Sequence, residues 1–239
     1  MKIVAVNGSP NRNGNTSLLV EEALRGAEEA GAEVEHLFLA DHHLEFCRGC
    51  LSNGTRRFCM STGRCVLPDD MEALKEKLYG ADGIIFASPS YGIEPTARMK
   101  NFVTDRLGLL AVYTSALKGK YFAGISTAGA IGAGAVAKKL SRAFSTGFFG
   151  RGYVSGRLGV AVGDHRVDAD GPTVTRARTL GRRMATDIRR GRRYPLQQLG
   201  KRLITRLVVR PVIVKNILAH RDTSMRAVYD TLAAEGVLR

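Results

Sequence analysis

Short apolar runs alternate along the chain with longer segments in which apolar residues recur every three or four positions. Residues 2–6 are rich in β-branched side chains, and residues 83–88 are continuously apolar, which is typical of parallel strands buried on both faces. In residues 17–30 the apolar side chains have helical spacing and glutamates occupy the polar positions. Strands separated by helices predict βαβ crossovers and a parallel sheet covered on both faces.

The same alternation continues over the first 190 residues. Strands are predicted at residues 2–6, 34–39, 83–88, 121–126 and 153–161, and helices at residues 17–30, 70–78, 133–145 and 174–189. Asp69 and Glu72 have the spacing of a capping box at the start of the second helix. We therefore predict one α/β domain at residues 1–190 and a helical extension at residues 191–239.

Composition limits the classes of protein that fit. Of the 239 residues, 44% are hydrophobic and 24% are charged, which is typical of a globular chain with enough apolar residues for a core. No segment approaches the roughly 18 to 20 apolar residues of a spanning helix, and Met1 leads directly into a strand-like run. We therefore expect a cytoplasmic chain. Its four cysteines all lie within residues 47–65, so a disulfide scaffold is not expected.

The segment after the first strand has the composition of an anion-binding loop. Residues 7–17 follow that strand and open the first helix, where free N–H groups and the helix dipole attract anions in a doubly wound sheet. Gly8 and Gly14 permit close approach to the backbone, and small polar residues supply donors: Ser9, Asn11, Asn15, Thr16 and Ser17. The segment is neither a Walker A loop nor a GxGxxG motif, and a polar, well-capped turn is the alternative interpretation.

Two further loops follow the third and fourth predicted strands. A tight turn with Tyr at the carboxyl end of a strand, as in residues 88–95, can lie along a planar ring, although it can equally be a surface turn. Residues 126–132 are small and polar, which suits a ligand or any tight connection. The residues of interest in these loops are Pro89, Ser90, Tyr91, Gly92, Thr127 and Gly129.

The loop after the first predicted strand, GSPNRNGNT, resembles the flavin-phosphate loop of the NADPH-dependent FMN reductase family. The loop after the third predicted strand resembles the S-P-x-Y segment of that family. The stretch from Pro95 to Arg106 resembles the helix that follows this segment in the family. The resemblance covers residues 1–165. It implies a flavodoxin-like fold, with a doubly wound, five-stranded parallel sheet and helices on both faces.

The resemblance also implies roles for individual residues. In the family the first loop surrounds the FMN phosphate, which gives that role to its five small polar residues. Asn11 stands where the family often has Arg, so Arg12 is expected to supply the charge contact. Residues 89–92 then contact the isoalloxazine and ribityl groups, and Thr127 and Gly129 lie near the pyrimidine side of the flavin.

Four cysteines follow the second predicted strand with the spacing C-x2-C-x8-C-x5-C: Cys47, Cys50, Cys59 and Cys65. Four thiols in one loop can ligate a [4Fe-4S] cluster or zinc, or they can remain free thiols or form a redox disulfide. Their position resembles that in the iron-sulfur flavoproteins, a branch of the same family with a compact C-x2-C-x2-C motif. The insertion at residues 51–58 either bulges out and preserves a cluster or indicates its loss.

The family resemblance implies an FMN-dependent NAD(P)H oxidoreductase. Hydride would pass from NAD(P)H to bound FMN and on to a quinone, a flavin or another acceptor, and no catalytic side chain is assigned because the cofactor carries the chemistry. Family members are usually homodimers or homotetramers, which we expect here. The alternatives are an iron-sulfur flavoprotein or electron carrier that passes electrons between proteins, and a scaffold that no longer binds flavin.

The excess positive charge is concentrated in the last third of the chain. The net charge is +14, but residues 1–165 hold 19 Lys and Arg against 16 Asp and Glu, whereas residues 166–239 hold 17 against 6. Leucines recur there at helical spacing, before Pro211 interrupts the pattern: Leu196, Leu199, Leu203 and Leu207. These leucines can pack on the chain's own domain or a partner subunit, or the segment can lie on an anionic membrane, or its charge can attract NADPH or an acidic protein. Nucleic-acid binding is disfavoured because no known binding module accompanies the charge.

Overall fold

A parallel sheet forms the centre of the computed structural model, which describes residues 1–50, 58–114 and 116–238. Its strands are β1 (Lys2–Asn7), β2 (Glu33–Phe38), β3 (Gly83–Ala87), β6 (Tyr121–Ala128) and β7 (Tyr153–Ala161). Their order is β2-β1-β3-β6-β7, and every neighbouring pair is parallel. This confirms the predicted doubly wound, flavodoxin-like sheet.

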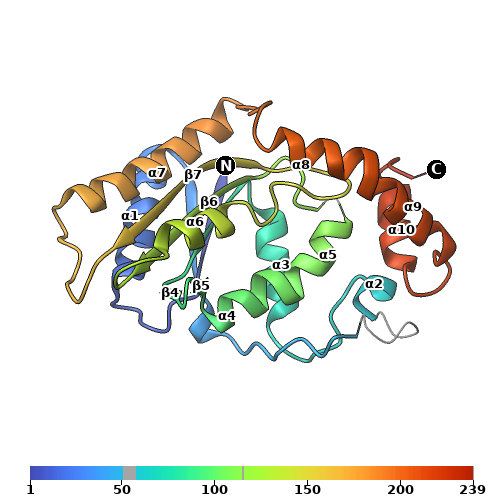
Figure 1. Ribbon diagram of the computed structural model, residues 1–239, viewed down its shortest axis with the longest axis horizontal. Coiled ribbons are helices and arrows are strands. Elements are labelled where there is room, and N and C mark those ends of the chain that lie inside the picture. The colour runs from blue at the N-terminus through green and yellow to red at the C-terminus, as the bar shows by residue number, and fades with distance from the viewer. Residues whose placement is uncertain (51–57, 115, 239) are drawn as a thin grey trace.

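Helices cover both faces of the sheet (Figure 1). One face carries α1 (Asn15–Glu29) and α7 (Pro172–Arg189), and the other carries α3 (Met71–Gly80), α4 (Ala97–Lys100), the π-helical segment η2 (Asn101–Leu107), α5 (Gly108–Tyr113) and α6 (Ala133–Ser141). Strand side chains alternate between the two layers, so Ile3 and Ala5 pack under α1 and α7, whereas Val4 and Val6 pack under the other helices. Burial on both faces explains why the strands are continuously apolar.

The two helices of the first face approach closely at glycines. A Cβ atom at Gly181 of α7 would lie 1.7 Å from the carbonyl oxygen of Ala23 in α1, and one at Gly26 would lie 2.0 Å from the carbonyl oxygen of Arg178. Arg178 also pairs with Glu22 across the same contact, with 2.6 Å between Nη2 and Oε2. The absence of side chains at these positions therefore sets the spacing of α1 and α7.

Three local features differ from the sequence-based expectations. Residues 90–95 form a short antiparallel hairpin, β4 (Ser90–Tyr91) and β5 (Glu94–Pro95), where only a turn was expected. Helix α6 ends at Ser141, four residues early. The predicted capping box was wrong, because Asp69 accepts from the N–H of Met71 and Glu72 accepts from the N–H of Cys65. A 3-10 turn, η1 (Leu39–Asp41), follows β2.

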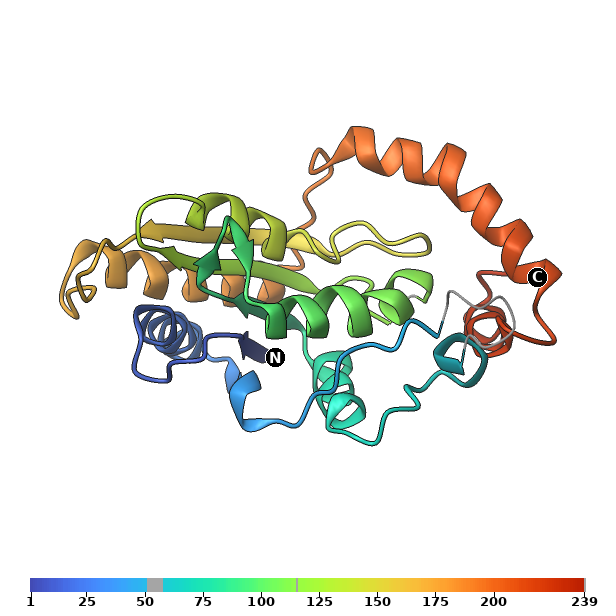
Figure 2. The same cartoon turned by 60° about the horizontal axis from the view of Figure 1, so that its bottom comes forward.

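The last third of the chain adds a helical extension. Segments α8 (Leu199–Ile204), η3 (Thr205–Val209) and α9 (Arg210–Ala219) form one rod that leads to α10 (Arg226–Ala234) (Figures 1 and 2). Pro211 does not interrupt this rod, because it is in the first turn of α9, directly after the π-helical turn η3 that shifts the hydrogen-bond register.

The extension has a core of its own. Ile217, Met225, Val228 and Leu232 are buried with Met60 of the short helix α2 (Phe58–Thr62). The four leucines of the predicted pattern are 42% to 79% exposed, and two of them, Leu199 and Leu203, line a cavity between the rod and the body of the protein. They are therefore not buried in a core, and the rod contributes Ile213, Val214 and Ile217 to the core of the extension instead.

Within the described ranges, no helix is both long enough and apolar enough to span a bilayer.

The glycine contact between α1 and α7 gives a stability prediction. We expect Gly181→Ala to lower the free energy of unfolding by at least about 1 to 3 kcal/mol, because the new methyl group overlaps the backbone of α1. Gly134→Ala is the matched control, since nothing lies within 4 Å of its Cβ position and alanine favours the helix. Urea unfolding followed by circular dichroism measures both, and equal stability of the two variants would contradict the contact.

Candidate functional site

The three predicted loops meet at the carboxyl edge of the sheet, where β1 and β3 are neighbours. The N–H of Gly8 donates to the carbonyl of Ala87 at 2.8 Å, and the Thr96 hydroxyl donates to the carbonyl of Gly8 at 2.8 Å. The hydroxyls of Thr16 and Thr127 hydrogen-bond at 2.7 Å. Residues 8–17, 88–96 and 126–132 therefore form one site at the switch point of the strand order.

The first loop is fixed by its own polar side chains. The N–H of Ser9 donates to Asn7 Oδ1 at 2.9 Å, and the N–H of Asn11 donates to Ser9 Oγ at 3.1 Å. Ser17 Oγ donates to the carbonyl of Asn11 at 2.9 Å, which ties the loop to the start of α1. These bonds fix the conformation of the loop.

The start of α1 leaves backbone donors available. The first helical hydrogen bond runs from the N–H of Leu18 to the carbonyl of Gly14, and Gly14 at the N-cap has no side chain that caps the helix. The N–H groups of Asn15, Thr16 and Ser17 therefore have no acceptor within the helix. Together with the helix dipole, they form a site that can bind an anion such as a phosphate.

A fourth segment closes this side of the site and was not found from the sequence. The Asn15 side chain donates to the carbonyl of His165 at 2.9 Å and accepts from the N–H of Val167 at 2.9 Å. The segment after β7 is thereby tied to the first loop. The only signal in the sequence is an asparagine among small polar residues, which does not identify a partner 150 residues away.

Arg12 is oriented away from the centre of the loop. Its guanidinium forms an ion pair with Asp41 and lies 4.6 Å from the centroid of the Phe38 ring, at the end of β2. In this conformation the charge of Arg12 is used to fasten the loop to β2. The groups of the loop that remain able to bind an anion are accordingly backbone amides and small side chains.

The second loop presents apolar side chains beside the anion site. Gly92 and Ile93 both have positive φ angles, 60° and 66°, which shape the tight turn between β4 and β5. Tyr91 and Ile93 are 59% and 51% exposed. The Ser90 Oγ atom is buried without a hydrogen-bond partner in the described part of the chain. A planar ring with polar substituents can therefore find apolar contact and a hydroxyl here.

All four cysteines line a small cavity of about 40 Å³. Three cationic side chains line it as well: Arg48, Lys75 and Arg106. Burial, and then the other three thiols, raise the pKa of Cys59 to about 11. Across the residues with described positions, no three potential metal ligands are grouped closely enough to hold a single ion as they stand. The inserted residues 51–57 lie outside the described part of the chain.

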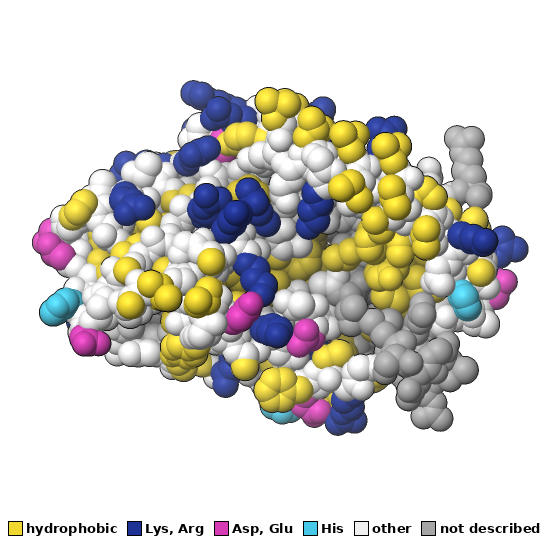
Figure 3. All heavy atoms as spheres, in the orientation of Figure 1, with side chains coloured by type: hydrophobic (Ala, Val, Ile, Leu, Met, Phe, Trp, Pro, Cys, Tyr) yellow, Lys and Arg dark blue, Asp and Glu magenta, His cyan; other side chains and the backbone are white. Residues whose placement is uncertain are grey.

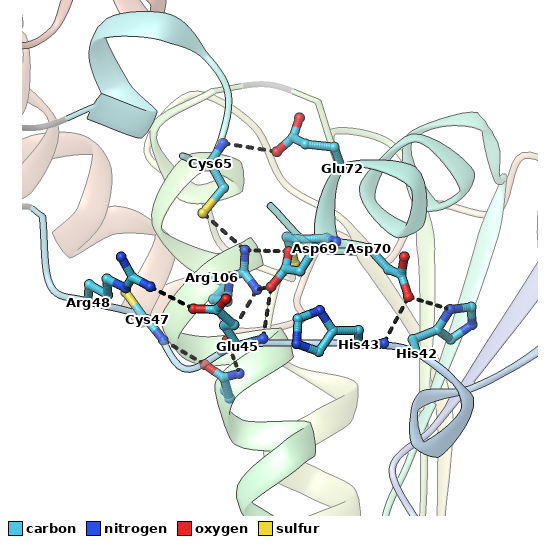
Figure 4. Close-up of polar contacts among 12 residues, drawn as sticks. His42, His43, Glu45, Cys47, Arg48, Cys65, Asp69, Asp70, Glu72 and Arg106 are labelled. Atoms are coloured by element: carbon cyan, nitrogen blue, oxygen red, sulfur yellow. Dashed lines mark hydrogen bonds and ion pairs between the residues drawn. The ribbon is translucent and has the colours of Figure 1, made fainter. Parts of the chain in front are cut away.

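Arg106 connects the walls of the cysteine cavity (Figure 4). Its guanidinium forms an ion pair with Asp69, donates to Cys65 Sγ at 3.0 Å and donates to the carbonyl of Glu45 at 3.2 Å. The side chains of Arg106 and Asp69 are 1% and 0% exposed. Burial opposes ionisation of Asp69, but the bonds from Arg106 and from two backbone N–H groups outweigh it and lower the pKa of Asp69.

Two further side chains hold the cysteine backbone in place. Asn101 of η2 accepts from the N–H of Cys47 at 3.2 Å, and Glu72 of α3 accepts from the N–H of Cys65 at 3.0 Å (Figure 4 shows the latter). Lys75 pairs with Glu72 at 2.5 Å. The cysteines thus come together through residues of two helices that the cysteine spacing does not identify.

The sheet order and the loops at its switch point define a flavodoxin-like protein. Residues 1–163 match the family model of the NADPH-dependent FMN reductases, and the chain belongs to that family.

Its curated relatives include iron-sulfur flavoproteins. One from Archaeoglobus fulgidus is 40% identical over 121 residues, and the match covers 51% of this chain and 51% of the relative. Another, from Methanocaldococcus jannaschii, is 41% identical over 100 residues, which cover 42% of this chain and 49% of the relative. The chain thus spans about half the length of these relatives.

Solved structures with the same fold include RosB with a bound riboflavin-phosphate intermediate. Its TM-score is 0.61 at 17% identity, and the match covers 84% of each chain.

The buried pair of Arg106 and Asp69 gives a pH-dependent prediction. At neutral pH we expect Asp69→Asn to lower the free energy of unfolding by roughly 3 to 5 kcal/mol, because Arg106 is left buried without its counter-charge. The Asp69 contribution is present above the ordinary carboxyl pKa of about 4 and is lost as the pH falls through the lowered native pKa. The difference from wild type therefore shrinks in acid.

Urea titrations at several pH values measure this difference. Asp222→Asn is the control, since the Asp222 side chain is 88% exposed and its ion pair in the described part of the chain is with the neighbouring Arg221. It is expected to change stability by less than about 1 kcal/mol. If the difference in free energy of unfolding between wild type and Asp69→Asn stayed constant down to acid pH, the role of the Asp69 charge would be contradicted.

Proposed function

We propose that the protein is an FMN-dependent NAD(P)H oxidoreductase. When bound, FMN would accept hydride from NAD(P)H and pass electrons to a quinone, a flavin or another acceptor. The observation that carries this proposal is the junction of the three loops at the switch point, with free backbone amides at the start of α1 beside the apolar hairpin turn. Family membership supports the same cofactor and electron donor.

The residues of the site take separate roles in this proposal. The backbone amides of residues 15–17, with the side chains of Ser9 and Asn11, would hold the FMN phosphate. The second loop, with Pro89, Ser90, Tyr91 and Gly92, would lie along the ring and the ribityl chain, and Thr127 and Gly129 would line the opposite side. Arg12 would act through its contact with Asp41, as a residue that fixes the loop.

We also propose that the four cysteines hold a [4Fe-4S] cluster. The four thiols line one cavity, and its charged lining residues are three cations and two carboxylates, Glu72 and Asp105. The excess of one positive charge suits a cluster that carries negative charge when bound by four thiolates. Arg106 already donates to one of the sulfur atoms, and its buried Nε has no partner among the described residues. The naming of the curated relatives as iron-sulfur flavoproteins supports this second cofactor.

The division of labour along the chain follows. Residues 1–190 would carry the groups that hold both cofactors, and residues 191–239 would form an extension whose core packs against Cys59. A homodimer or homotetramer in the cytoplasm, as usual in the family, is part of the same proposal.

The flavin proposal has a direct test. We expect the protein to bind FMN and the flavin absorbance to bleach when NADPH or NADH is added without oxygen. Asn11→Asp keeps the acceptor for the Asn13 N–H but places a carboxylate at the phosphate loop, so it is expected to weaken FMN binding at least about tenfold. Asn216→Asp, which makes the same change of charge in α9, is the control.

Failure to bind FMN would overturn the flavin proposal. Bound FMN that neither nucleotide bleaches would instead favour the electron carrier.

The cluster proposal is tested separately. Protein purified without oxygen is expected to contain about four iron and four acid-labile sulfide per chain, and Cys59→Ser is expected to lose most of both. Asn11→Asp is expected to keep the iron while losing flavin, which separates the two sites. Absence of iron and sulfide from the wild-type protein would mean that the four cysteines are free thiols or a redox disulfide.

A further inference from the structure

A second cavity, lined by cations, lies between the extension and the body of the protein. It has a volume of about 480 Å³ and lies against residues 146–151 and the start of β7, far from the flavin loops at the carboxyl ends of the strands. Six cationic side chains line it: Lys118, Arg151, Arg193, Arg202, Arg206 and Arg210. No Asp or Glu is among its described lining residues.

These charges are not neutralised by the protein. Of the ion pairs in the described part of the chain, none includes any of the six cations. Arg151 instead donates to the carbonyl of Tyr194 at 2.8 Å and lies 4.6 Å from the centroid of the Tyr153 ring. Burial, and then Arg202 and other cations, lower the pKa of Arg151. Crowded like charges of this kind stabilise a bound anion.

The helix that supplies three of these arginines carries apolar side chains on its exposed side. We call this the apolar ridge: Leu199, Leu203, Ile204, Leu207, Val208 and Val212, which are 42% to 68% exposed. Figure 3 shows hydrophobic side chains gathered over α8 and α9, with Lys and Arg beside them. Leu199 and Leu203 also line the basic cavity, so the ridge borders it directly. A contiguous exposed apolar patch of this kind marks an interaction surface.

The charge of the segment distinguishes between the partners that can cover it. Residues 188–221 contain ten Lys and Arg and no Asp or Glu. A second copy of the chain would bury the ridge but place these like charges side by side, and a nucleic acid would neutralise the charges but leave the ridge in water. An anionic bilayer does both, because its phosphates meet the cations while the apolar side chains enter the boundary of the acyl region.

We propose that residues 193–218 form a peripheral binding site for anionic phospholipid membranes. The basic cavity takes lipid phosphate groups, and the apolar ridge enters the interface beside it. The site does not depend on the flavin or on the cysteines, so it stands or falls independently of the proposed oxidoreductase activity. Its effect is to hold the flavin-bearing domain at a membrane surface.

Vesicle flotation with the full chain tests the proposal. The protein is expected to float with phosphatidylcholine vesicles that contain phosphatidylglycerol and not with pure phosphatidylcholine, and the bound fraction is expected to fall as salt is raised. Arg193→Gln combined with Arg206→Gln removes two exposed cavity charges that make no ion pair in the described structure. We expect the affinity of this variant for the vesicles to fall at least about tenfold. Ile204→Ser with Val208→Ser, on the ridge, is expected to weaken binding at every salt concentration.

A matched control removes the same charge elsewhere. Lys138→Gln with Arg176→Gln changes two exposed cations of α6 and α7 and is expected to leave vesicle binding unchanged. An equal loss of vesicle binding in this control would show that binding depends only on the net charge of the protein, and it would overturn the proposed site. Equal binding to both vesicle types would also overturn it.

Two further measurements separate the other occupants. Thermal stabilisation by inorganic pyrophosphate without any vesicle binding would assign the cavity to a free phosphate compound and overturn the lipid proposal. Light scattering reports the mass of the protein in solution. A dimer that the two ridge substitutions dissociate, again without vesicle binding, would assign the ridge to a second copy of the chain.

Discussion

The cysteine cavity depends on the buried ion pair of Arg106 with Asp69. Removing two charges from water costs several kcal/mol for each ion, and this cost is offset where the ions pair closely and further hydrogen bonds reach them. Asp69 meets this condition through Arg106 and the N–H groups of Glu45 and Met71. The pair therefore joins the segment before Cys47, the start of α3 and the helix η2, and the cysteines take their positions from this junction.

The same helix connects the cysteine cavity to the flavin loops. Thr96, at the N-cap of α4, donates to the carbonyl of Gly8 in the first loop, and Asn101 and Arg106 lie farther along α4 and η2. The π-helical segment shifts the register so that both residues face the cysteine segment. One continuous helical element thus contacts the two proposed cofactor sites.

The sequence was sufficient where structure depends on neighbouring residues. Apolar periodicity located all five strands of the parallel sheet. Gly, Pro and small polar residues located the three loops that meet at the switch point. The sequence did not predict contacts in which a side chain bonds to residues far away along the chain. The bonds of Asn15 to residues 165 and 167 and those of Arg106 to Cys65 and Asp69 carry no local pattern. The leucines of the extension show the same limit, because helical spacing alone does not identify which side of a helix is covered.

The uneven charge of the chain makes the molecule an electric dipole. The positive end is the extension and the cavity at the amino ends of β6 and β7, whereas the flavin loops lie at the opposite edge of the sheet. In the field of an anionic surface such a molecule experiences a torque before any contact forms, and it arrives with the extension first. The edge of the sheet that carries the three loops would then point away from the surface and face the water.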